Sequence, residues 1–167
     1  MGEILTLTKQ DVDMKKQKLF ITKSFDYHTG RTKPTKTEKS TREIAVNSSV
    51  LMLYQKYIRK NTNIKLKLSL RPEEDTLFVN KMLIRPTYKN IRTHLAGLCQ
   101  KLGIKKVRIH ELRHTHASLL IAKGIPVQYV SERLGHADVT TTLNTYTHVI
   151  SEVQRENDDI IRRMKNF

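Results

Sequence analysis

Three residues divide the stretch 108–147 into short helices, and this division constrains the fold more than any other feature of the chain. Gly124 and Gly135 are typical glycines at helix C-termini, and Pro126 is typical of the first turn of a helix. We therefore expect one helix that begins near His110 and ends at Gly124. A second should run from Pro126 to Gly135, and a short helix or turn should follow over 140–147.

The rest of the chain predicts a small sheet and further helices. We expect the end of a helix over 1–7, strands over 18–22 and 42–46, a turn at 27–30, a helix capped by Ser48 or Ser49, a polar and basic stretch over 61–75 with a break at Arg71-Pro72, a short strand over 76–79, a helix from Pro86 to Gly103, and a terminal helix over 152–164 capped by Ser151. The predicted fold class is α+β, mostly helical, with a small antiparallel sheet near the N-terminal end.

The charge of the chain favours a polyanionic partner. Lysine and arginine number 31 against 16 aspartate and glutamate, which gives a formal net charge of +15. Double-stranded DNA is the partner we expect, because no long basic amphipathic helix stands apart to favour a membrane surface. Cys99 is the only cysteine, so an internal disulfide and a cysteine metal cluster are excluded, and its apolar neighbours predict a buried thiol. No apolar run is long enough to cross a membrane.

Four side chains of the stretch 108–147 could perform chemistry together. His110 and Arg113 are three residues apart, so they face the same side of a helix. His136 adds a second imidazole, and Tyr146 adds a phenol. The alternative is that these residues are ordinary helix-surface groups without a chemical role. We would accept that interpretation for His114 or His116 taken alone.

The segment HELRH also matches the zinc-protease pattern His-Glu-x-x-His. In that interpretation His110 and His114 would bind zinc, Glu111 would be the base, and Glu132 could be a third ligand. The pattern is short and arises often by chance. It accounts neither for the charge of +15 nor for the downstream Leu-Gly-His and Tyr146.

His-x-x-Arg, then Leu-Gly-His, then a tyrosine ten residues after that histidine resembles the tyrosine recombinases, the phage-integrase family. The segments HELRHTHASLL and GIPVQYVSERLGHADVTTTLNTYTHV carry the resemblance. A weaker resemblance extends over nearly the whole chain, which implies that residues 1–167 are the family's C-terminal catalytic domain. GEILTLTKQDVD is similar to the segment after the family's first catalytic arginine, and PTKTEKSTREIAV is similar to its β-hairpin with a catalytic lysine.

The resemblance implies a role for each matching residue. Tyr146 would attack a DNA phosphate, His110 would be a general base or proton relay, and Arg113 would bind the non-bridging oxygens. His136 would hydrogen-bond the same phosphate, and Lys36 would protonate the departing 5′-oxygen. The product would be a 3′-phosphotyrosine and a free 5′-hydroxyl. The energy of the phosphodiester is conserved in this linkage, so no cofactor or metal is expected.

Basic residues surround the predicted catalytic lysine. Arg31, Lys33 and Lys39 are expected to contact DNA weakly. Lys33 and Lys39 are also near enough to Lys36 to compete for its assignment.

The chain departs from the family pattern at its start. The family has Arg-x-Gly-Glu, and here Gly2 and Glu3 are present, so the arginine would stand immediately before Met1. We also expect the family's N-terminal DNA-clamping domain to lie outside this chain. We therefore expect a fragment that folds, binds DNA weakly and cleaves it poorly.

The segment 151–167 has two open interpretations. The resemblance implies that it docks on a neighbouring protomer in a DNA-bound homotetramer, with an apolar face of Ile160, Ile161, Met164 and Phe167. Equally, it could pack on its own domain.

The predicted function is site-specific DNA recombination. The protein would integrate and excise a mobile element, either a bacterial phage or a conjugative element. Such a protein would act in the bacterial cytoplasm, associated with the nucleoid. Two alternatives stay open: a chromosome-dimer-resolving recombinase of the same family, and a non-catalytic basic DNA-binding module. The type IB topoisomerases share the chemistry, but Leu-Gly-His favours a recombinase.

Overall fold

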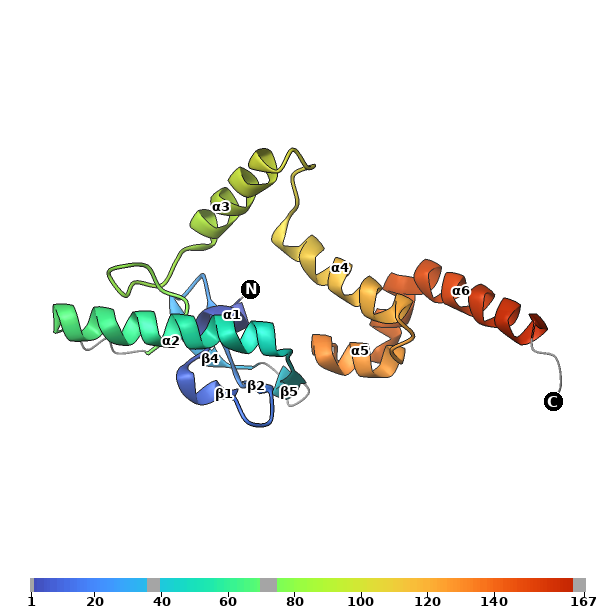
Figure 1. Cartoon of the computed structure of the whole chain (residues 1–167), viewed down its shortest axis with the longest axis horizontal. Helices are drawn as coiled ribbons and strands as arrows, with labels where there is room; N and C mark the ends of the chain where they lie inside the picture. The colour runs from blue at the N-terminus through green and yellow to red at the C-terminus, as the bar shows by residue number, and fades with distance from the viewer. Residues whose placement is uncertain (1, 36–39, 70–74, 164–167) are drawn as a thin grey trace. The chain divides into compact units, whose positions relative to one another are not determined.

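The computed structural model describes residues 2–35, 40–69 and 75–163, and it divides into two compact units over 1–106 and 107–167 (Figure 1). Each unit is considered by itself. The mostly helical fold with a small antiparallel sheet near the N-terminal end confirms the predicted fold class. In the described part of the chain, no helix combines the length and apolarity that crossing a bilayer requires.

The first unit begins with a short helix and a small sheet. Its elements are α1 (Gly2–Thr6), the 3-10 helix η1 (Lys9–Asp11), β1 (Val12–Asp13), β2 (Lys18–Ile21), β3 (Lys23–Asp26), β4 (Arg31–Pro34) and β5 (Arg42–Ala45). The three-stranded sheet has the order β1-β2-β5, and in the β2–β5 pair Lys18 lies opposite Ala45. The two strands predicted from KLFIT and REIAV are therefore confirmed, and they pair as expected.

A second hairpin, β3–β4, was not predicted. Phe25 lies opposite Thr32, and the turn over 27–30 ends at Gly30, whose φ is +67°. The turn was predicted from its sequence. The strands beside it were missed because KSFD and RTKP lack the apolar alternation that marks a half-buried strand.

Helix α1 packs closely on β3. A Cβ atom at Gly2 would lie 2.4 Å from Ser24 Oγ and 2.6 Å from the Phe25 carbonyl oxygen, so this contact needs glycine. Both Nη atoms of Arg42 donate to the carboxylate of Glu3, at 2.8 and 3.0 Å. This forked pair fixes α1 to the start of β5.

Helix α2 (Ser48–Leu68) is longer than the sequence indicated. Asn47 caps it by accepting from Val50 N at 3.0 Å, so the prediction of a serine cap is wrong. The helix also continues over 61–68, where the sequence indicated only a polar and basic stretch, and the break predicted at Arg71-Pro72 lies outside the described residues. Asn61 is buried there, and its side-chain amide donates to the Leu77 carbonyl at 2.8 Å. A polar residue at a core position hid the helical period.

The predicted strand over 76–79 is reduced to a single bridge between Thr8 and Thr76. Leu77 N donates to the Leu7 carbonyl at 2.8 Å, and both leucines enter the core. Burial therefore holds this segment without extended strand pairing. The core of the unit consists of Leu7, Leu19, Ile21, Leu51, Tyr54 and Leu77.

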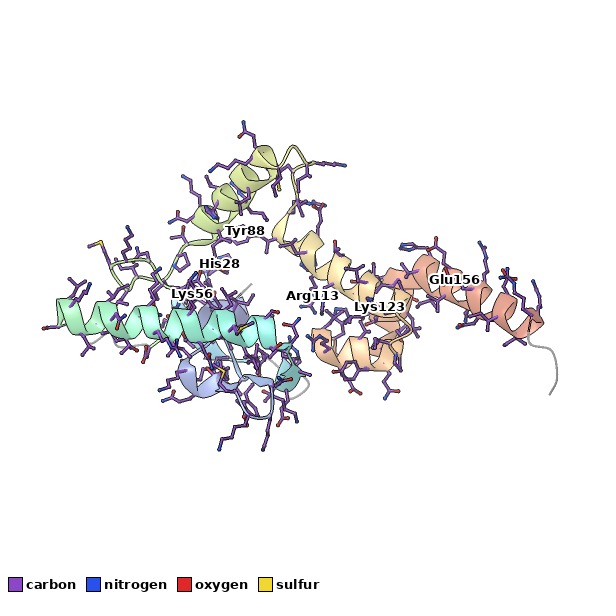
Figure 2. All side chains as sticks on the ribbon, viewed as in Figure 1. His28, Lys56, Tyr88, Arg113, Lys123 and Glu156 are labelled. Atoms are coloured by element: carbon purple, nitrogen blue, oxygen red, sulfur yellow. The ribbon has the colours of Figure 1, made fainter. Side chains whose placement is uncertain are left out.

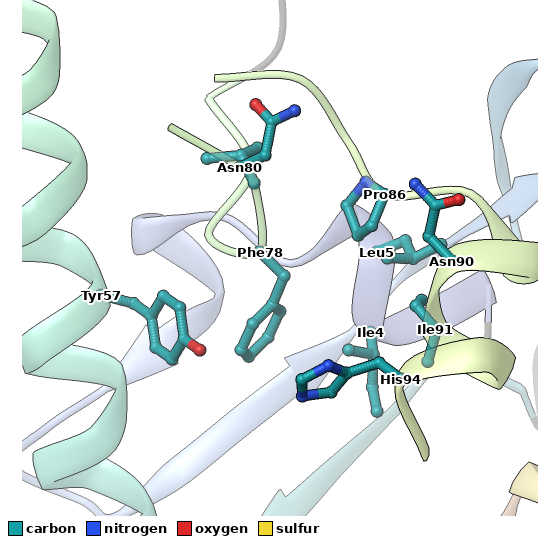
Figure 3. A pocket seen from close by; sticks show the side chains of 10 residues that line it. Ile4, Leu5, Tyr57, Phe78, Asn80, Pro86, Asn90, Ile91 and His94 are labelled. Atoms are coloured by element: carbon teal, nitrogen blue, oxygen red, sulfur yellow. The ribbon is translucent and has the colours of Figure 1, made fainter. Parts of the chain in front are cut away.

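Helix α3 (Tyr88–Lys101) begins two residues after the predicted Pro86, because Thr87 caps it by accepting from Asn90 N at 3.2 Å. Gly103 ends it with a φ of +64°, as predicted. Cys99 on this helix is buried, which confirms the prediction for its thiol. Elements of the unit line an open, mostly apolar pocket of about 670 Å³, in which Phe78 lies opposite side chains from α1 and α3 (Figure 3).

The second unit consists of three helices, α4 (Ile109–Ala122), α5 (Val127–Leu134) and α6 (Val139–Arg163) (Figure 1). Gly124 and Gly135 have φ of +76° and +73°, so the predicted helix ends are confirmed. The core consists of Ala117, Ile121, Val130, Leu134, Tyr146 and Val149.

Helix α6 contradicts the prediction of two separate helices after residue 140. It is continuous apart from a kink at Tyr146, where φ is −116° and ψ is 20°. Ser151 lies inside the helix and donates to the Thr147 carbonyl at 3.0 Å, so it is not a cap. A serine can satisfy its hydroxyl against the preceding turn of a helix, and the sequence alone does not separate this from capping.

Candidate active site

Tyr146 lies at the kink of α6, and its side chain is buried. Its exposed fraction is only 3%, and it packs with Ala117 and Ile121 of α4. Its hydroxyl lies 2.9 Å from Nδ1 of His114, which is a hydrogen-bond distance. The kink thus places a phenol against the polar face of α4.

The imidazoles of α4 form a row that leads to this phenol. The rings of His110 and His114 are perpendicular, with centroids 4.9 Å apart, and the ring of His114 lies 5.9 Å from that of Tyr146. His110 is exposed and His114 is half-buried. The family pattern assigned the functional role to His110, whereas His114 taken alone was interpreted as an ordinary helix-surface residue. The spacing of four between them was the signal that both share one helix face.

Arg113 is part of the same constellation. Its side chain projects from α4, and Nη2 donates to the Leu134 carbonyl at the end of α5 (Figure 2). Burial raises the pKa of Tyr146, and the positive charge of Arg113 opposes that rise. The charge of Arg113 therefore acts on the hydroxyl of Tyr146, and both are predicted catalytic residues.

His136 follows the left-handed Gly135 that ends α5. Its backbone N donates to the Ser131 carbonyl at 3.1 Å, and its Nδ1 lies 2.7 Å from the hydroxyl of Thr142. Thr142 is fully buried, with an exposed fraction of 0%. This hydrogen bond fixes the plane of the imidazole. The sequence did not single out Thr142, because one threonine among the five of the segment VTTTLNTYT carries no distinguishing pattern.

His116 has a structural partner on another helix. Arg133 Nε donates to His116 Nε2 at 3.1 Å, so this pair links α4 to α5. Burial and the nearby guanidinium lower the pKa of His116.

The predicted residues of the first unit are only partly described. Lys36 and Lys39 lie outside the described residues. Arg31 is exposed on β4, and Lys33 forms an ion pair with Asp26 at 2.6 Å. The Lys33 ammonium holds the pKa of Asp26 well below its usual range.

The zinc alternative finds no third ligand in the part of the chain that the structure describes. Over residues 2–35, 40–69 and 75–163, no group of three or more His, Cys, Asp or Glu side chains could hold a metal ion. His114, one of the two histidines of HELRH, instead contacts Tyr146.

Comparison with known proteins shows the family of the chain. Residues 1–152 match the Phage integrase family, and this chain therefore belongs to that family. It is 30% identical over 170 residues to the integrase of Staphylococcus phage L54a, covering 98% of this chain and 48% of that protein. It is 29% identical over 161 residues to the ICEBs1 integrase of Bacillus subtilis, covering 95% and 44%. The chain thus spans about half the length of the curated relatives it matches.

Solved structures show the same fold. The Tn1549 transposon integrase in complex with a circular intermediate DNA superposes with a TM-score of 0.78 at 20% identity, covering 96% of this chain and 54% of that chain. The XerA recombinase superposes with a TM-score of 0.69 at 26% identity, covering 99% and 53%.

Proposed function

We propose that this chain is the catalytic domain of a tyrosine recombinase that cleaves and rejoins DNA strands. The observation that carries the proposal is the position of Tyr146, buried at a helix kink with its hydroxyl on His114 and its charge state coupled to Arg113. A phenol has a pKa of about 10, so it needs an acceptor for its proton before it can attack. We assign residues 1–167 to this domain.

Each predicted residue then has one chemical task. Tyr146 attacks a backbone phosphate and forms the 3′-phosphotyrosine, while the 5′-oxygen departs with a proton from Lys36. Arg113 and His136 bind the non-bridging oxygens and stabilise the charge of the transition state. His110 serves in proton transfer. A 5′-hydroxyl of a second strand reverses these steps, so the phosphodiester count is unchanged and no cofactor is consumed.

The biological role we propose is integration and excision of a mobile element. The relatives that support it are the phage integrase and the ICEBs1 integrase, each aligned over nearly the whole chain. A chromosome-dimer-resolving role is the second candidate, because a XerC-like tyrosine recombinase of Caldanaerobacter subterraneus is 27% identical over 165 residues. A strain in which the gene is deleted distinguishes the two roles. Loss of the excised circle of a mobile element would support integration and excision, and accumulation of unresolved chromosome dimers would support the second role.

We propose further that four copies assemble on paired DNA sites through the segment 151–167. Its last described helical turn exposes Ile160 and Ile161, with exposed fractions of 57% and 59%. Apolar side chains this exposed favour burial against another surface. Ile160→Glu with Ile161→Glu should then abolish the DNA-bound tetramer in sedimentation analysis and leave single-site binding intact.

The test of the catalytic proposal is covalent capture on nicked duplexes with a randomised core. Cleavage releases a short strand from such a substrate, so rejoining fails and the adduct accumulates. The chain should form an adduct, Tyr146→Phe should form none, and Tyr129→Phe, a change at an exposed tyrosine of α5, should behave as the wild type. DNA binding without any adduct would instead favour a binding module.

The same assay tests the expected impairment. A version with arginine placed before Met1, in the family's Arg-x-Gly-Glu order, should form the adduct about 100-fold faster than the chain as it stands, because a second cation stabilises the transition state. Equal rates would contradict a catalytic role for that position.

A further inference from the structure

We propose that His114 is a catalytic residue: it accepts the phenolic proton of Tyr146 during cleavage and returns it during rejoining. This inference rests on the proposed function and assigns the proton-transfer step to a residue outside the His-x-x-Arg and Leu-Gly-His patterns. It gives His110 the part of a relay between His114 and solvent.

The first argument is the contact with the reacting atom. The hydroxyl of Tyr146 lies 2.9 Å from Nδ1 of His114, within the distance for direct proton transfer. The tyrosine side chain is buried, so bulk water is a poor acceptor at this oxygen. Arg113 is close, but a guanidinium has no lone pair available to accept a proton.

The other two predicted imidazoles, His136 and His110, have contacts that differ from the contact of His114 with Tyr146. Nδ1 of His136 lies 2.7 Å from the Thr142 hydroxyl. We therefore assign His136 to the DNA phosphate and not to the proton of Tyr146. His110 lies one helical turn before His114 and contacts its ring at 4.9 Å between centroids. The row therefore runs from Tyr146 through His114 to His110.

Charged side chains from two helices lie around His114. His114 lines an open cavity of about 540 Å³ together with two carboxylates, Glu111 from α4 and Glu152 from α6. Arg108 binds Glu111 through Nε at 2.8 Å and adds a positive charge beyond it. The charged or titratable groups around His114 are thus Glu111, Glu152, Arg108, Arg113, His110 and Tyr146.

The proposed step balances. With its own proton on Nε2, His114 accepts the phenolic proton on Nδ1 and becomes an imidazolium. The bond between Tyr146 Oη and phosphorus forms, the bond from phosphorus to the 5′-oxygen breaks, and that oxygen takes a proton from Lys36. In rejoining, the incoming 5′-hydroxyl returns its proton to Lys36, and the departing Tyr146 oxygen recovers its proton from His114.

The test separates proton transfer from mere positioning. In His114→Asn, the side-chain amide can occupy the place of Nδ1 and hold the Tyr146 hydroxyl, but it cannot accept a proton. His114→Ala removes both abilities, and His148→Asn, at an exposed position of α6, is the matched control. Adduct formation is followed on saturating nicked duplex, with DNA affinity and circular dichroism measured for every variant.

We expect His114→Asn and His114→Ala to cleave about 100-fold more slowly than the wild type with unchanged DNA affinity, while the control stays within about threefold. An asparagine variant within about threefold of the wild type would reduce His114 to a positioning residue and overturn the proposal. If asparagine disturbs the circular dichroism spectrum, His114→Gln serves under the same criteria.

A second substrate locates the step at which His114 acts. Sulfur in place of the bridging 5′-oxygen departs without needing a proton, so this substrate should restore cleavage to Lys36→Ala but leave His114→Asn slow. Restoration of His114→Asn would place the residue at the leaving group and overturn the proposal. If the wild type forms no adduct on either substrate, the proposed function itself is contradicted. If the wild type forms the adduct and the His114 variants form it at the wild-type rate, only the role of His114 is contradicted.

Discussion

Replacing Thr142 by valine tests whether a buried hydroxyl orients His136. Valine has nearly the shape of threonine, so Thr142→Val keeps the packing of a fully buried position and removes the hydroxyl that lies 2.7 Å from Nδ1. Loss of a buried hydrogen bond costs about 1–3 kcal/mol. If the same energy holds the imidazole toward the transition state, cleavage should slow by about 5- to 160-fold.

The assay compares two variants by urea denaturation and by the rate of adduct formation. Thr142→Ser keeps the hydroxyl and loses one methyl group, which costs about 1 kcal/mol in the free energy of unfolding. Both variants should therefore be less stable, but only valine should cleave slowly. A valine variant with the wild-type cleavage rate would refute the argument that Thr142 positions His136.

Three further predictions concern stability and pH. Glu3→Gln should lower the free energy of unfolding in urea by about 1–3 kcal/mol, because it breaks the forked pair with Arg42, and an unchanged value would contradict this. Gly97→Ala should raise it by about 0.5–1 kcal/mol, since a Cβ there meets nothing within 4 Å, whereas Gly2→Ala should lower it through the clash with β3. His116 has a lowered pKa in the folded state, so it favours the folded state above about pH 6.5 and that contribution is lost as the pH falls. His116→Gln should flatten the decline of stability below this pH, and an identical decline would count against the assignment.

Several helix ends were predictable because they carry strong local signals. Gly124, Gly135 and Gly103 all adopt positive φ, which glycine tolerates and other residues rarely do. The longer helices α2 and α6 were not delimited correctly. In α2 a buried asparagine interrupts the apolar period, and in α6 Ser151 has the residue type of a helix cap but lies inside the helix.

The site itself was predictable as a set of residue types but not as a set of contacts. The spacing of His110, Arg113, His136 and Tyr146 predicted them as a candidate catalytic group. The partner of the phenol, His114, depends on the kink of α6 and on how α4 and α6 pack, and no spacing rule specifies either. Thr142 was hidden for the same reason.

The measurement that tests the central claim most directly is mass-spectrometric mapping of the covalent adduct, with the polarity of the DNA ends determined in parallel. We expect a nucleotide linked through its 3′-phosphate to the peptide that contains Tyr146. The other end of the cleaved strand should carry a free 5′-hydroxyl. Attachment to a different residue, or a 5′-phosphate linked to the protein, would contradict the account.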